Sequence, residues 1–524
     1  SMLMVNNAIV SNDQTLFFDK DENNVIRNEG YSVRPSAGFI GRINYNYADR
    51  YLLELSGRYD GSFIFPRNKR WGFFPSVSAG WRVSSEQFFA NSVLSNYISN
   101  LKFRVSYGEM GNDDNYSSNK VLGIGDWDYM YGYNMNAGTG VIASDPFISS
   151  SGSTIGSVSQ RGMPVTNLSW VKSSMLNIGV DLGFLNNRLT LEVDGFMRKR
   201  SGLTDRRGDV YIPYETGYSE MPLENLNTDK HIGIDGLIKW QDNVGREFYY
   251  SVGFNATLAR KKNGNVYGER FGNSWEQYRK SGQNRWSYVN WGYEVIGRFQ
   301  TQEEIDAYPV IMNISNGSDR NKLVLPGDLI YKDQNGDGVI NDYDSRPIGY
   351  AEGGLPYMTY GLNLACSYKG FDIGIDFAGA ALQSFQRNWE TKWPFQAGNT
   401  FNYMVEDRWH HEDPLDPSTP WVSGNYPALR PQSVNAWHVY CNNSTYWLTN
   451  AAYFRMKNLE IGYTIPQKIT QKIAMQKFRV FFNGTNLFSI DNTSKFGLDP
   501  ENSDTNGLGY PMVRVLTFGA TITF

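Results

Sequence analysis

A twelve-residue stretch in the second half of the chain, DQNGDGVINDYD at positions 333–344, carries oxygen-bearing side chains at the spacing of a calcium-binding loop. Gly338, at the sixth position, permits the sharp turn that such a loop needs. The stretch therefore predicts a bound Ca²⁺, or Mg²⁺, whose role is to stiffen a long loop by neutralising carboxylates. The predicted ligands are Asp333, Asn335, Asp337, the carbonyl of Val339, and Asp344.

The twelfth position departs from the usual pattern, because Asp344 stands where a helix-flanked calcium loop has Glu. The shorter carboxylate closes the coordination shell with less reach, which leaves the affinity and the choice between Ca²⁺ and Mg²⁺ open. The residues before the loop, GDLIYK at 327–332, are strand-like, and no flanking helix is evident. The alternative interpretation is a loop of Asx turns that holds no metal.

The remaining residues give no second chemical site. His410 and His411 are adjacent in WHHED and point in different directions on most backbones, so a solvated loop is favoured over a metal site. No nucleophile–base pattern, phosphate loop or zinc-protease signature is found. No catalytic residue is therefore assigned, and the chain is not expected to be an enzyme.

Composition indicates which elements could hold the predicted metal loop. Aromatic residues make up 15% of the 524 residues and glycine is abundant, which favours strands and turns over helices. The formal net charge is -4 with both signs interspersed, so a nucleic-acid partner is not expected. Composition is uniform along the chain, which indicates one architecture.

Apolar and polar residues alternate with period two in a long series of segments. One face of each segment is apolar, while the other is too polar for a soluble core, so we expect lipid outside and a wet lumen or polar plug inside. The thirteen predicted strands are 39–47, 51–60, 73–83, 101–109, 174–184, 188–198, 230–240, 247–260, 357–368, 370–380, 452–464, 477–487 and 513–524.

Connections between these strands alternate between short and long. Tight turns are expected at 48–49, 185–187, 241–246 and 369–370, and each is followed by a long link. This sorting is typical of an outer-membrane barrel with periplasmic turns and extracellular loops. The main extracellular loops are predicted at 110–173, 199–229, 261–356, 381–451 and 488–512.

With an odd number of antiparallel strands, the first and the last run in the same direction, so two edges stay unpaired. Unsatisfied backbone groups at such edges are not tolerated in hydrocarbon. We therefore expect the remaining strands upstream of residue 1. Residues 1–38 are interpreted as the end of an extracellular loop, and residues 39–524 as the C-terminal portion of the transmembrane barrel. Strand 513–524 descends, which places Phe524 at the periplasmic rim.

Several segments, taken in order, resemble the SusC/RagA family of TonB-dependent outer-membrane transporters. They include IGRINYNYADRYLLELSGRYDGS (40–62), WGFFPSVSAGWRVSSEQFF (71–89), LKFRVSYGEMGN (101–112), PGDLIYKDQNGDGVINDYDSRPIG (326–349), YFRMKNLEIGYTIP (453–466) and FRVFFNGTNLFSI (478–490). The resemblance implies a 22-stranded antiparallel barrel, with the missing strands, a plug and the TonB-contacting segment upstream. It also implies a SusD-like lipoprotein lid and, in Phe524, a signal read by the barrel-assembly machinery.

The resemblance implies active import of a glycan or peptide across the bacterial outer membrane, energised through TonB. A passive porin or specific channel is the second interpretation, and a secreted β-rich carbohydrate-binding or adhesin module is the third. Aromatic side chains in the long loops could contact substrate, but loop packing is the favoured role and no substrate-binding residue is assigned. They include Trp127, Tyr129, Tyr131, Trp275, Trp286, Trp389, Trp393, Trp409 and Trp421.

Overall fold

The computed structural model describes residues 18–20, 26–28, 36–113, 129–130, 133–135, 158–160, 162–218, 220–312, 323–351, 355–398, 400–430, 442–502, 504–510 and 512–524. One large sheet of 14 strands dominates it, with thirteen strands in an unbroken order and β25 (Ser489–Asp491) paired to β23 beside that order. Each predicted strand is confirmed. The thirteen are β3 (Ser36–Tyr47), β4 (Tyr51–Ser62), β5 (Trp71–Arg82), β6 (Ile98–Asn112), β9 (Val171–Phe184), β10 (Leu189–Arg206), β11 (Leu223–Val244), β12 (Phe248–Asn263), β17 (Met358–Tyr368), β18 (Phe371–Ala381), β23 (Tyr453–Thr464), β24 (Lys477–Thr485) and β26 (Val515–Thr523).

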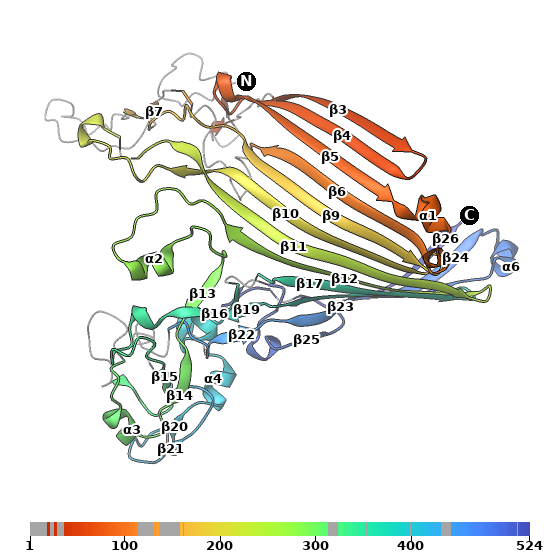
Figure 1. Cartoon of the computed structure of the whole chain (residues 1–524). Helices are drawn as coiled ribbons and strands as arrows, with labels where there is room; N and C mark the ends of the chain where they lie inside the picture. Colours follow the sequence, from red (N-terminus) through yellow and green to blue (C-terminus); the bar gives the residue numbers. More distant parts are fainter. Residues whose placement is uncertain are drawn as a thin grey trace.

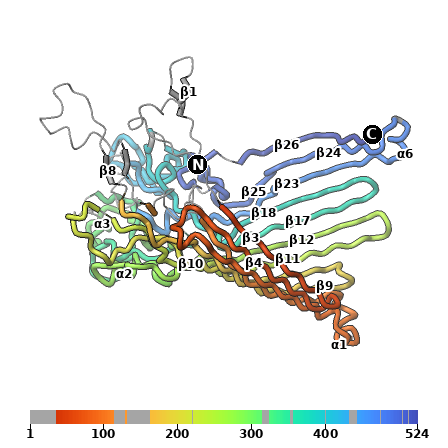
Figure 2. Tube along the Cα trace, turned by 90° about the horizontal axis from the view of Figure 1, so that it is seen from above, coloured from red at the N-terminus to blue at the C-terminus, as the bar shows by residue number. Residues whose placement is uncertain are grey.

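Every neighbouring pair in this sheet is antiparallel, and strands next to each other in the sheet follow one another along the chain. The strands form a single curved wall (Figure 2). Strands β3 and β26 are its two edges, and neither has a second sheet partner among the described residues. Thirteen antiparallel strands make these two edges run in the same direction, so they could not pair with each other as antiparallel neighbours.

The two rims of the wall differ as the sequence predicts. Short turns gather at one rim, together with α1 (Gln87–Ala90), α6 (Gln467–Thr470) and the C-terminus, while the long loops leave from the other (Figure 1). The turn between β3 and β4 has φ of 52° at Ala48 and 54° at Asp49, which fits the primed turns that match strand twist. The Asn46 side chain closes this turn by accepting a hydrogen bond from the Asp49 N–H at 3.0 Å.

The two faces of the wall also differ. Large apolar side chains stand exposed along one face and are not covered by a second layer of the described residues. They include Leu53, Leu55, Phe103, Val105, Ile232, Ile234, Ile238, Val252, Phe254, Leu258, Phe371 and Ile373. Polar and charged side chains occupy the alternate positions on the opposite face. This is the arrangement expected where one face meets lipid and the other an aqueous or polar interior.

The long loops build a separate lobe at their rim (Figure 1). Its core is a cluster of buried apolar side chains that includes Phe299, Tyr331, Phe385 and Trp447. Its helices are α2 (Ser274–Lys280), α3 (Gln302–Ala307) and α4 (Asn402–Glu406). Its short strands are β13 (Val289–Gly292), β14 (Val295–Arg298), β15 (Leu329–Tyr331), β16 (Arg346–Ala351), β19 (Ser384–Gln386), β20 (His410–His411), β21 (Trp421–Val422) and β22 (Leu448–Asn450).

Three smaller features complete the description. Two further hairpins pair β1 (Phe18–Lys20) with β2 (Ile26–Asn28) and β7 (Tyr133–Met135) with β8 (Val158–Gln160). Helix α3 begins after Thr301, whose hydroxyl accepts the Glu304 N–H at 3.2 Å. None of the helices in the described ranges has the length and apolar character required to cross a membrane.

Two predicted bounds were wrong. Strands β10 and β11 extend to Arg206 and from Leu223, so their connecting loop is much shorter than the predicted 199–229. Pairing between the two strands continues through a bulge between Ser201 and Leu203. Hydrogen bonds from the partner strand extend each strand past the bulge, and the alternation of residues along a single segment does not reveal these bonds.

Replacing Ile375 on the apolar face of β18 with arginine tests the assignment of faces. A charge placed in the hydrocarbon at mid-depth is expected to lower the free energy of unfolding by about 2 to 4 kcal/mol. Asp376→Arg at the adjacent inner position is the matched control and should have a much smaller effect. The measurement is denaturant unfolding of the protein in lipid vesicles. Equal losses in the two variants would contradict the assignment.

Candidate functional site

The inner face of the wall is held by ion pairs that bridge neighbouring strands. Arg104 on β6 contacts Asp181 on β9 through Nε at 2.8 Å, and its Nη2 reaches Asp194 on β10 at 2.8 Å. Arg479 on β24 pairs in the same way with Asp372 and Glu460. These contacts join three adjacent strands in each case. They give the inner face fixed charges, which a polar or aqueous interior can accommodate and hydrocarbon cannot.

The predicted metal loop lies in the lobe, between β15 and β16. Asp333 accepts the backbone N–H of Gly336 at 2.7 Å and of Gly338 at 2.8 Å. Asp344 is fully buried, and its two oxygens accept the N–H groups of Gln334 and Asn341, each at 2.8 Å. Each of the two carboxylates, one at each end of the loop, therefore holds two backbone N–H groups of the loop.

The remaining predicted ligands lie on the same turn. Asn335 donates from Nδ2 to Oδ2 of Asp337 at 2.9 Å, and Oδ1 of Asp337 accepts the Val339 N–H at 2.8 Å. In the part of the chain that the structure describes, no group of three acidic, His or Cys side chains is arranged to hold a metal ion. The loop thus brings the predicted residues together, with their oxygens directed to amide and backbone N–H groups.

Electrostatics distinguishes the two ends of this loop. Burial raises the pKa of the Asp344 carboxyl above its usual value, although the Asn341 and Gln334 N–H groups oppose that shift. The Gly338 N–H holds the pKa of Asp333 below its usual value. Asp344 forms no ion pair with a cationic side chain among the described residues. A bound cation would compensate the charge of this buried carboxylate.

The other sequence candidates take structural positions. His410 and His411 form β20, and their Nδ1 atoms each lie 2.6 Å from a backbone carbonyl oxygen. Trp421 packs on His411 with ring centroids 4.1 Å apart, and Trp409 is buried. These contacts fit loop packing, whereas Trp127 and Tyr131 lie outside the described residues. Phe524 follows β26 at the short-turn rim and is 76% exposed.

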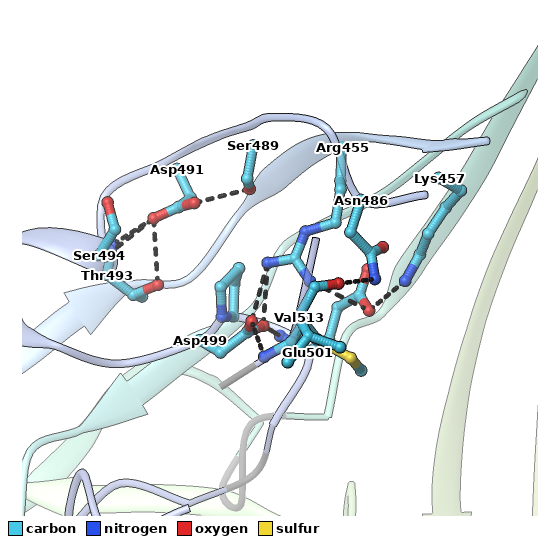
Figure 3. Close-up of polar contacts among 12 residues, drawn as sticks. Arg455, Lys457, Asn486, Ser489, Asp491, Thr493, Ser494, Asp499, Glu501 and Val513 are labelled. Atoms are coloured by element: carbon cyan, nitrogen blue, oxygen red, sulfur yellow. Dashed lines mark hydrogen bonds and ion pairs between the residues drawn. The ribbon is translucent and has the colours of Figure 1, made fainter. Parts of the chain in front are cut away.

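The last long loop is anchored to the wall by a buried group of charges (Figure 3). Nη2 of Arg455 on β23 lies 3.0 Å from both carboxylate oxygens of Asp499, and Nη1 lies 3.4 Å from Glu501. Lys457 also pairs with Glu501, and the Arg455 side chain is only 6% exposed. No motif in the sequence marks this group, because its members lie 44 residues apart along the chain.

Comparison with known proteins places this architecture. No family model matches the chain. It is 28% identical over 546 residues to the TonB-dependent receptor P26 of Formosa agariphila. This alignment covers 98% of this chain and 49% of the relative. It is 26% identical over 511 residues to the TonB-dependent receptor SusC of Bacteroides thetaiotaomicron. That alignment covers 94% of this chain and 44% of SusC. The chain spans about half the length of the curated relatives it matches.

The same fold is found among solved structures. The structure of the RagAB peptide importer in the closed-closed state aligns with a TM-score of 0.67 at 21% identity, covering 96% of this chain and 49% of that one. Over nearly its whole length the chain is similar in sequence to TonB-dependent receptors that include SusC, and it has the fold of the RagAB structures. It is a bacterial outer-membrane β-barrel protein. The exposed apolar face of the wall is accordingly its lipid face.

Replacing Arg455 with methionine should release the last long loop. The buried Asp499 carboxylate would lose its cationic partner, while Glu501 would keep Lys457. Breaking a buried pair in this way costs about 3 to 5 kcal/mol. Amide hydrogen exchange of residues 488–512 is expected to accelerate.

The control for this variant is Lys332→Met, which removes an exposed pair with Glu294 at 3.2 Å. Exposed pairs contribute less than about 1 kcal/mol, so exchange in the loops should stay close to that of the parent protein. If Arg455→Met left exchange in 488–512 unchanged, the anchor would have no role in holding the loop.

Proposed function

We propose that the chain forms part of an active importer that carries a glycan or a peptide across the outer membrane. The main observation in favour is the combination of a lipid-facing apolar row with a charged inner wall, in a chain related to TonB-dependent receptors along nearly its whole length. The similar RagAB structure is that of a peptide importer, which supports transport as the activity class. Import, and not catalysis, is the proposed role of the inner face.

The long-loop rim is proposed to face the cell exterior and to meet a SusD-like lipoprotein. The lobe has its own core at the long-loop rim of the wall, so it offers a stable surface at the mouth (Figure 1). The short-turn rim then faces the periplasm, from which TonB would act on a plug carried by the rest of the protein. The remaining barrel strands are proposed to pair with the edges β3 and β26.

Energy coupling is tested by uptake in whole cells. A protonophore that collapses the proton-motive force is expected to abolish accumulation of the nutrient, since TonB-dependent movement of the plug requires that force. Uptake is measured with labelled glycan and peptide mixtures in cells with and without the gene. Uptake that continues at an unchanged rate after collapse would instead identify a passive channel.

We further propose that the loop at 333–344 binds Ca²⁺. The proposal is supported by the order of oxygen-bearing residues and by the buried Asp344, whose negative charge has no cationic partner among the described side chains. Each carboxylate oxygen that accepts a backbone N–H retains a second lone pair for an ion. The ligands would be Asp333, Asn335, Asp337, the Val339 carbonyl and Asp344, and the ion would stiffen the lobe.

Adding Ca²⁺ to chelator-treated protein should raise the melting temperature, because an ion that binds only the folded state stabilises it. Asp337→Ala removes a ligand and is expected to abolish that increase. Asp342→Ala, in the same loop but outside the ligand set, should retain it. A melting temperature that Ca²⁺ leaves unchanged in the parent protein would reject the site.

A further inference from the structure

Three long loops meet around a hollow of about 380 Å³ in the lobe. The volume lies near the lower end of the range for small-molecule pockets, roughly 300 to 1,000 Å³. Arg298 at the end of β14, Arg387 after β19, and Lys495 in the turn Ser494–Phe496 all line it. Cationic side chains from three separate parts of the chain therefore line the hollow.

Arg387 is the most deeply placed of these cations, with 3% of its surface exposed. Its Nη1 donates to the Tyr426 hydroxyl at 3.1 Å and its Nη2 to the Tyr446 carbonyl at 3.0 Å, while Nε has no hydrogen-bond partner. The ring of Phe496 lies 4.2 Å from its Cζ. Aromatic faces stabilise a buried guanidinium only in part, and buried charges are normally paired with an opposite charge.

The other two cations also lack a counter-ion. Arg298 donates to the Gly424 carbonyl at 3.1 Å, and its Cζ lies 4.7 Å from the Tyr446 ring. Lys495 lies with Nζ 4.9 Å from the Phe496 ring. Among the described residues, no carboxylate forms an ion pair with Arg298, Arg387 or Lys495. Three positive charges thus surround one hollow, and an anion inside it would relieve their mutual repulsion.

Nearby carboxylates are engaged elsewhere. Asp407 accepts both the backbone N–H and the side-chain amide of Asn425. Asp491 accepts hydrogen bonds from the Ser489 hydroxyl at 2.7 Å and from the Ser494 N–H at 2.8 Å. These bonds hold the two carboxylates in their own turns, and among the described residues neither forms an ion pair with the three cations.

We propose that this hollow binds an oxyanion group, a carboxylate or a sulfate, carried by a ligand unit of the size of one sugar or one amino-acid residue. Guanidinium groups match the geometry of such oxyanions. Asn450 and Asn492 on the lining add amide groups for neighbouring hydroxyls or amides of the ligand. The faces of Tyr446 and Phe496 are already used by cations, so charge and not ring stacking is the basis of recognition.

This proposal concerns binding and not import, so it is tested on the purified protein without energy coupling. Calorimetric titration compares D-glucuronate with D-glucose, N-acetyl-L-glutamate with N-acetyl-L-glutamine, and sodium sulfate alone. At least one oxyanion is expected to bind and its neutral analogue to bind at least tenfold more weakly. Added sodium chloride should weaken the binding, because salt screens the partly exposed charges.

Arg298→Gln and Lys495→Gln are the test variants, since Arg298 is half-buried, Lys495 is exposed, and neither is part of the buried lobe core. Each is expected to weaken oxyanion binding by roughly tenfold, the usual effect of losing a charge-assisted contact. Lys468→Gln, an exposed lysine at the short-turn rim, is the matched control and should bind as the parent does.

The preferred probe identifies the source of the oxyanion. Tighter binding of glucuronate assigns an acidic sugar, tighter binding of N-acetylglutamate assigns an acidic peptide, and binding of sulfate alone assigns a sulfate group. The proposal is overturned if none of the oxyanions binds, if the neutral analogues bind equally well, or if neither test variant weakens binding.

Discussion

Backbone N–H and C=O groups inside a lipid bilayer have no water to bond with, and each one left unsatisfied costs several kcal/mol. The thirteen-strand order of the wall answers this constraint by pairing each interior strand on both sides. Side-chain alternation then follows from the pleat, because successive residues of a strand point to opposite faces. The lipid row and the charged inner row are two results of the same hydrogen-bonding requirement.

Charges on the inner face show how this wall tolerates polar groups next to a membrane. Arg104 contacts carboxylates on two other strands, so its charge is compensated within the protein. Arg479 does the same further along the sheet. Such cross-strand pairs hold neighbouring strands in register and present a polar surface toward the interior. The sheet thereby presents a polar, charge-compensated face on one side and an apolar face on the other.

The lobe follows a different physical rule. Loops as long as these would lose much conformational entropy on ordering, and burial of apolar area is what offsets that loss. The lobe core supplies it with large side chains such as Phe385 and Trp447, both almost fully buried. Arg455 adds a second attachment for the last loop (Figure 3). The long-loop rim is consequently a built structure that can hold binding groups in place.

The sequence alone determined the strands, their faces, the position of the tight turns and the residue types of the 333–344 loop, because each of these depends on neighbours within a few positions. Only the tertiary structure decided how far β10 and β11 extend, since that depends on the partner strand. It also decided that Arg455 meets Asp499 and that Arg298, Arg387 and Lys495 share one hollow. Contacts between distant segments leave no periodic trace in the chain, so burial and charge pairing had to be seen in three dimensions.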